Sequence, residues 1–130
     1  MIDIKLIRED PERFKTAAAD KNIDVDIGRL MEIDARLLQI SKDLQQIKTE
    51  QNRVGKEIAG LKGAEKQALI EEMSGLKDRA KVLGEQAAEL QPEFDALMLR
   101  VAQPADEGVP VGADESGNVE LRRVGELPSF

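Results

Sequence analysis

The most constraining feature of this 130-residue sequence is a pair of apolar heptad repeats that mirror each other about one point. The first repeat advances in alternating steps of three and four, with one polar member, at Leu30, Ile33, Leu37, Ile40, Leu44, Ile47, Gln51, Val54, Ile58 and Leu61. The second keeps the same rhythm with apolar residues throughout, at Leu69, Met73, Leu76, Ala80, Leu83, Ala87, Leu90, Phe94, Leu97 and Val101. This spacing is typical of the seam of a coiled coil.

The two repeats match layer by layer if the chain folds back on itself. Leu30 then faces Leu97, and each following layer is also filled. The centre of this pairing falls between Gly63 and Ala64, where a glycine can end a helix in a left-handed conformation at little cost. The sequence therefore predicts an all-α fold, a long antiparallel two-helix coiled-coil hairpin with its turn near residues 62–65.

A short helical segment is predicted before the hairpin. Asp10 suits an N-cap and Pro11 the first position of a helix, which should run to about Asp20. A connector over residues 22–26 follows, and its last residue is an aspartate that can cap a long helix beginning at Ile27.

Prolines and glycines mark the end of the hairpin. Pro92 lies at an outermost heptad position, so we expect a bend there that leaves the seam intact. After Gln103 the chain becomes rich in proline and glycine, which predicts an extended tail. The alternation in residues 119–122 predicts one short strand, which needs a sheet to join.

These patterns divide the chain into three parts. Residues 1–27 form an N-terminal cap segment, residues 28–102 form the hairpin, and residues 103–130 form a linker. Because a single strand has no partner in this sequence, we expect the linker to be the start of a larger domain that lies outside the 130 residues.

The composition argues against catalysis. The sequence has no cysteine and no histidine, which excludes disulfides, thiolate chemistry, zinc sites of the usual kind and the commonest general base. We predict no catalytic, cofactor-binding or metal-binding residue. No apolar run approaches the ~20 residues of a membrane span, and the first residues do not resemble a signal peptide, so we expect a soluble, cytoplasmic protein without membrane contact.

The charge is sorted along the hairpin. The net charge is −7, but residues 28–102 carry 12 basic and 13 acidic side chains. In an antiparallel pair, the e and b heptad positions of both helices share one edge. Over residues 41–88 that edge, here called the lysine edge, contains four lysines and no carboxylate: Ser41, Gln45, Lys48, Asn52, Gly55, Ala59, Lys62, Ile70, Ser74, Lys77, Lys81, Gly84 and Ala88. Five carboxylates lie on or toward the other edge: Asp43, Glu50, Glu57, Glu72 and Glu89.

An edge of lysines and small residues suits a passing phosphate backbone. Ammonium groups donate to phosphate oxygens, and glycines allow close approach. Lys48 and Lys77 should face each other across this edge, whereas Glu50 and Arg79 can pair across the other. The absence of tryptophan and tyrosine favours recognition of RNA backbone and shape over base stacking. The alternative is a solvated coil whose charges are unevenly placed.

The sequence as a whole resembles the N-terminal arm of the seryl-tRNA synthetases. The resemblance rests on the opening string Met1 to Pro11, on Asp24-Val25-Asp26 before the first long helix, and on residues 109–115, 118–120 and Gly125-Glu126 in the tail. It implies an arm that holds the long variable arm and elbow of serine tRNA, typically across a homodimer. It also implies a class II catalytic domain that uses ATP and Mg and lies beyond Phe130.

The resemblance extends to one stretch of the first helix. Asn52, Lys56 and Ile58 fit a family stretch that usually reads Arg-Asn, two residues, a small residue, then Lys. Gln51 departs from it by replacing the arginine. Gln51 is also suited to fixing the register of the coil, and Lys56 and Lys62 to complementing a helix dipole. The candidate RNA-binding residues are Lys48, Asn52, Arg53, Lys56, Lys62, Lys77 and Lys81.

Two other functions fit a coiled-coil hairpin. A prefoldin-like chaperone would offer apolar residues at its tip, but residues 60–67 are mostly polar. A coil used only for dimerisation would need a second apolar stripe, whereas this seam closes on itself. Both alternatives fit the sequence less well than an RNA-binding arm does.

Overall fold

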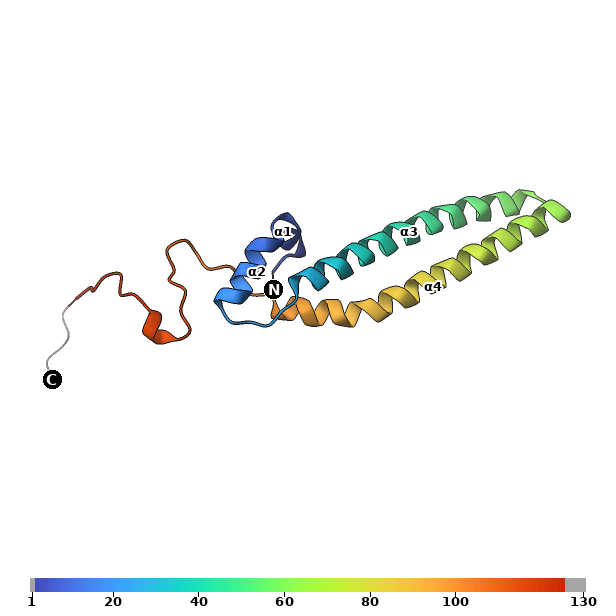
Figure 1. Cartoon of the computed structure of the whole chain (residues 1–130). Coiled ribbons are helices and arrows are strands. Elements are labelled where there is room, and N and C mark those ends of the chain that lie inside the picture. The colour runs from blue at the N-terminus through green and yellow to red at the C-terminus, as the bar shows by residue number, and fades with distance from the viewer. Residues whose placement is uncertain (1, 126–130) are drawn as a thin grey trace.

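A computed structural model describes residues 2–125 of the chain. The helices of this part are α1 (Ile4–Glu9), α2 (Pro11–Asp20), α3 (Ile27–Gly60), α4 (Ala64–Arg100) and the 3₁₀ turn η1 (Glu115–Gly117). Helices α3 and α4 lie side by side as a long hairpin, α1 and α2 gather at its base, and the tail leads away from the hairpin (Figure 1). The predicted all-α hairpin is confirmed.

The ends of the long helices lie where the sequence predicts them. The Asp26 carboxylate accepts a hydrogen bond of 2.8 Å from the backbone N–H of Arg29 and so caps α3. Between the two helices, Gly63 has a φ of 72°, a conformation that favours glycine, and it reverses the chain. With 34 and 37 residues, α3 and α4 reach roughly 50 Å from the base.

The seam of the hairpin contains every position that the heptads predict. All twenty positions are buried or half-buried. The most buried all belong to α3, where Leu30, Ile33, Ile40, Ile47 and Val54 are at most 4% exposed. The polar member, Gln51, is half-buried among them.

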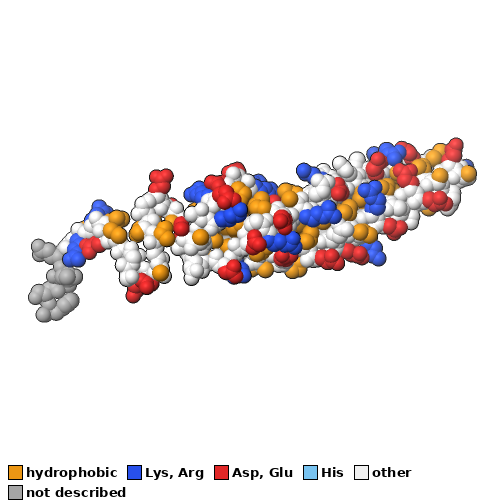
Figure 2. Space-filling view, in the orientation of Figure 1, with side chains coloured by type: hydrophobic (Ala, Val, Ile, Leu, Met, Phe, Trp, Pro, Cys, Tyr) orange, Lys and Arg blue, Asp and Glu red, His pale blue; other side chains and the backbone are white. Residues whose placement is uncertain are grey.

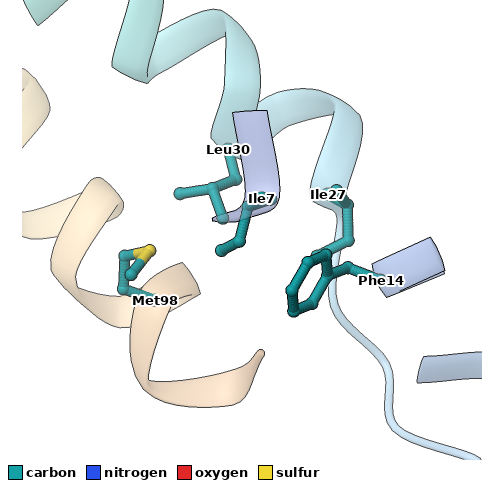
Figure 3. Close-up of a cluster of buried hydrophobic side chains, with 5 residues drawn as sticks. All are labelled: Ile7, Phe14, Ile27, Leu30 and Met98. Carbon is teal, nitrogen blue, oxygen red and sulfur yellow. The ribbon is translucent and has the colours of Figure 1, made fainter. Parts of the chain in front are cut away.

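The base of the hairpin holds a separate apolar core. Five side chains from four helices converge there, as Figure 3 shows: Ile7, Phe14, Ile27, Leu30 and Met98. Ile7 and Leu30 are fully buried. This core attaches α1 and α2 to the hairpin, which a two-helix seam alone would not do.

Helix α1 is an element that the sequence analysis missed. It is six residues long and is capped by Asp3, whose carboxylate accepts a hydrogen bond of 2.9 Å from the backbone N–H of Lys5. An aspartate directly before Ile4, with Ile7 three residues later, is the signal that could have found it. Helix α2 was predicted with the correct ends, and Asp10 caps it.

The strand predicted over residues 119–122 is wrong. The described part of the tail contains no strand, and its one regular element is η1, where Asp114 accepts a hydrogen bond of 2.9 Å from the backbone N–H of Ser116. An alternating pattern forms a strand only beside another strand, and residues 2–125 offer none. Met1 and Glu126, the outer ends of the resemblance to the family, lie outside the described residues.

Helix α4 continues through Pro92. Figure 1 shows α4 bending near the base of the hairpin, in its orange part. The proline lies at an outermost position, so the seam remains closed on either side of it. No helix within residues 2–125 combines the length and the apolar character needed to cross a membrane.

Candidate nucleic-acid interface

One edge of the hairpin is joined by arginines, and we call it the arginine edge. Arg29 donates two hydrogen bonds to the Glu93 carboxylate, at 2.8 and 2.9 Å. Further along, Arg36 donates to the Gln86 side chain at 2.7 Å. Each of these bonds runs from α3 to α4, so they confirm the antiparallel register that the heptads predict.

Arg53 is the most heavily paired residue of the arginine edge. Its guanidinium lies 2.7 Å from a Glu50 oxygen, 2.9 Å from Glu57 and 3.2 Å from Glu72 on α4. The hydrogen bonds that Arg53 donates to Glu50 and Glu57 raise the pKa of Arg53 above its usual range. The predicted Glu50–Arg79 ion pair does not form in the described structure, because Glu50 is occupied by Arg53.

The lysine edge has the opposite character. Lys48, Lys62 and Lys77 are exposed, and none of them forms an ion pair with any described residue. Lys81 has one distant partner, a Glu85 oxygen at 4.0 Å. The positive charge of this edge is therefore available to an external anion, whereas three of the arginines on the other edge are already bound to carboxylate or amide oxygens of the chain.

Helix α1 covers the lysine edge at its base. Asp34 and Met98 stand at e positions, which belong to this edge, yet both are buried. Asp34 is bound by Arg8 of α1, and Met98 packs in the basal core with Ile7. The open part of the edge on α3 therefore begins near residue 41 and ends at residue 62, roughly 30 Å away.

The structure places six of the seven candidate RNA-binding residues on or beside one edge. Lys48, Lys62, Lys77 and Lys81 lie on the lysine edge with Asn52, and Lys56 lies beside it on the outer surface of α3: all six are exposed. Arg53 lies beside Asn52 and Lys56, but its guanidinium differs from these six because it reaches the arginine edge and bonds Glu72 of α4.

The sequence analysis passed over Lys42. It lies two heptads before Lys56 on the same outer surface of α3, and it is exposed and forms no ion pair with any described residue. The 14-residue spacing, which returns a helical residue to the same face, was the signal available to find it. Figure 2 shows how charged side chains line the rod on the face in view.

Comparison with known proteins decides the family. The sequence profile described as "Seryl-tRNA synthetase N-terminal domain" matches residues 1–103. The chain belongs to this family. The resemblance noted in the sequence is thereby confirmed, and the family favours the arm over a chaperone or a simple dimerisation coil.

Curated relatives of this seryl-tRNA synthetase N-terminal domain are serine–tRNA ligases. That of Symbiobacterium thermophilum is 33% identical over 132 residues, that of Deinococcus radiodurans 36% over 130, and that of Thermomicrobium roseum 37% over 131. Each alignment covers 100% of this chain but only 29–31% of the relative. The chain thus spans about a third of the length of the ligases that it matches.

A solved structure supports the same fold. The seryl-tRNA synthetase from Pyrococcus horikoshii, in complex with ATP, is similar to this chain with a TM-score of 0.78 and 27% identity. The match covers 94% of this chain and 28% of that one. In the Pyrococcus horikoshii protein, the matching hairpin is therefore one part of a much longer chain.

Proposed function

We propose that this chain is the tRNA-binding arm of a serine–tRNA ligase and that its lysine edge holds the long variable arm and elbow of serine tRNA. One observation carries the assignment of the edge: among the described residues its lysines have few or no ion-pair partners, whereas Arg29, Arg36 and Arg53 on the opposite edge are bonded to side chains of the hairpin. Membership of the family supplies the class of RNA.

The chemistry of the edge fits a phosphate backbone. Lysine ammonium groups release condensed counterions when they contact phosphates, which gives affinity that falls with salt. The described surface offers no aromatic platform, since the three phenylalanines include Phe14 and Phe94 in or against the basal core. Discrimination then depends on whether an RNA presents a stem that a straight rod can lie along.

The rest of the ligase completes this proposal. Residues 1–27 brace the base of the arm, residues 28–102 form it, and residues 103–130 lead toward a class II catalytic domain. The ligase acts in the cytoplasm as a homodimer, and the arm of one subunit holds tRNA for the active site of the other. ATP and Mg belong to that catalytic domain of the ligase.

Binding to serine tRNA tests the proposal. The chain is titrated with serine tRNA, with and without its long variable arm, over a salt series. The triple variant K48A/K77A/K81A is compared with K5A/K15A/R79A, which loses the same charge away from the lysine edge. We expect the first variant to bind more weakly and to lower the magnitude of the slope of log K against log salt by about 2 to 3. Each lost phosphate contact accounts for about 0.7–0.9 of that change, and the variant loses three lysines.

The control variant should bind like the wild type. Equal weak binding to tRNA with and without the variable arm, unchanged in K48A/K77A/K81A, would contradict the proposal. Helix content measured by circular dichroism verifies that each variant keeps the hairpin.

A further inference from the structure

We infer that the RNA-facing surface continues from the lysine edge over the outer face of α3, through Lys42 and Lys56, and is closed off on the α4 side by a row of carboxylates. This inference rests on the proposed function and specifies which of the two helices the RNA covers. Two rows define it. The α3 outer row is Lys42, Thr49 and Lys56, and the α4 outer row is Glu71, Asp78 and Glu85.

The two outer rows occupy the same layers of the hairpin with opposite charge. Both consist of outermost heptad positions, so they lie on opposite sides of the rod. In the antiparallel register, Lys42 shares a layer with Glu85, and Lys56 shares one with Glu71. All six residues are exposed. The hairpin is therefore positively charged on one outer face and negatively charged on the other.

Beyond residue 34, the surface of α3 between the lysine edge and the arginine edge carries no carboxylate. Beyond Asp34, the acidic residues of α3 are Asp43, Glu50 and Glu57, all at g positions on the arginine edge. Glu50 and Glu57 are paired with Arg53, whereas Asp43 accepts a hydrogen bond of 2.9 Å from the neutral Gln39 amide. Beyond residue 34, a phosphate backbone that crosses α3 therefore meets no carboxylate before it reaches the arginine edge.

Asn52 connects the lysine edge to the outer row. Lys48, Asn52 and Lys56 follow one another at intervals of four residues, so their side chains are neighbours on the helix surface. The Asn52 side chain makes no hydrogen bond to the described residues and can donate to a phosphate or ribose oxygen between the two lysines. These three residues form a continuous donor track from one row to the next.

The α4 outer row opposes RNA on its own side. Glu71 and Asp78 form no ion pair with any described residue, and Glu85 has only the 4.0 Å contact with Lys81. A phosphate that moves past Lys77 onto the outer face of α4 comes within a Debye length of these carboxylates. The RNA backbone is therefore repelled from that face. Repulsion of this kind restricts the orientation of a partner as effectively as attraction does.

Four variants of the full chain test this inference with a serine tRNA transcript that carries its long variable arm. K42A/K56A removes the α3 outer row, and K5A/K15A loses the same charge elsewhere. E71Q/D78N/E85Q neutralises the α4 outer row, and D106N/E107Q/E115Q neutralises three acids of the tail. Dissociation constants are measured over a salt series, and circular dichroism verifies the helix content.

We expect K42A/K56A to weaken binding and to lower the salt slope by about 1.4 to 1.8, as two lost phosphate contacts require, while K5A/K15A binds like the wild type. E71Q/D78N/E85Q should tighten binding more than the tail variant does. The inference is overturned if K42A/K56A keeps wild-type affinity and slope while K48A/K77A/K81A weakens binding, or if E71Q/D78N/E85Q weakens it. If neither set of lysines matters, the proposed function itself fails.

Discussion

Arg8 and Asp34 form a bidentate ion pair that joins α1 to α3. The Arg8 Nε donates to one carboxylate oxygen at 2.6 Å and Nη2 donates to the other at 2.8 Å. The Asp34 side chain is 5% exposed and that of Arg8 34%. The hydrogen bonds and the charge of Asp34 raise the pKa of Arg8. Because Asp34 stands where the lysine edge would otherwise continue, this pair fixes α1 over the base of that edge.

Removing Arg8 and removing Asp34 should lower the free energy of unfolding by unequal amounts. In R8A a buried carboxylate loses both of its donors, which for Asp34 costs about 3 kcal/mol of unfolding free energy. In D34A the exposed part of Arg8 can turn to water, so we expect a smaller loss. Urea unfolding followed by circular dichroism measures both variants, and equal destabilisation would show that water reaches Asp34 freely.

Gly63 should not tolerate a side chain. Its φ of 72° and ψ of −144° belong to a region that only glycine populates readily, so G63A should destabilise the hairpin by about 1–3 kcal/mol. G60A is the matched control, because Gly60 ends α3 with no positive φ and an added Cβ would meet no atom within 4 Å. Thermal unfolding should separate the two variants, and an equal loss in both would disprove the argument from conformation.

Two glycines inside α4 should separate stability from binding. Gly75 and Gly84 have open space where a Cβ would be, so G75A and G84A should each stabilise the helix by about 0.5–1 kcal/mol. Only Gly84 lies on the lysine edge, where it allows close approach of a backbone. We expect G84A to weaken tRNA binding and G75A to leave it unchanged, and identical affinities would argue against close contact at Gly84.

The Arg29–Glu93 pair should make stability depend on pH. The hydrogen bond and charge of Arg29 lower the pKa of Glu93 below its ordinary 4.5. A lowered pKa in the folded state stabilises the protein above pH 4.5, and this stabilisation is lost as the pH falls through the lowered value. Both side chains are nearly half exposed, so the effect is small. The melting temperatures of wild type and E93Q should differ at pH 7 and converge at about pH 2.

The seam and the turn could be predicted because their signals are local and repeated. Twenty heptad positions specify one register, and Gly63 marks the one place where that register allows reversal. The cap at Asp26 and the start of α2 at Pro11 follow from side-chain chemistry within three residues. Each of these features is encoded by neighbours in the sequence and does not depend on distant contacts.

The covered base of the lysine edge could not be predicted in the same way. Helix α1 is too short to be stable alone and exists because Ile7 is buried against α3 and α4. Heptads place Asp34 and Met98 on an open edge, whereas a third element buries them. The partners of Arg53 were missed for a related reason, because three carboxylates lie within its reach and heptad positions do not rank them.

The pairing of Arg53 leads to a prediction about the limits of the RNA surface. Its guanidinium is bound by three carboxylates on the arginine edge, so a phosphate would have to displace them. We expect R53A to lower the melting temperature while serine tRNA binds nearly as tightly as to the wild type. K48A removes one unpaired cation from the lysine edge. It should weaken the binding of serine tRNA and leave the melting temperature nearly unchanged. Loss of binding in R53A equal to that in K48A would mean that RNA reaches the arginine edge and that Arg53 exchanges its carboxylates for phosphate.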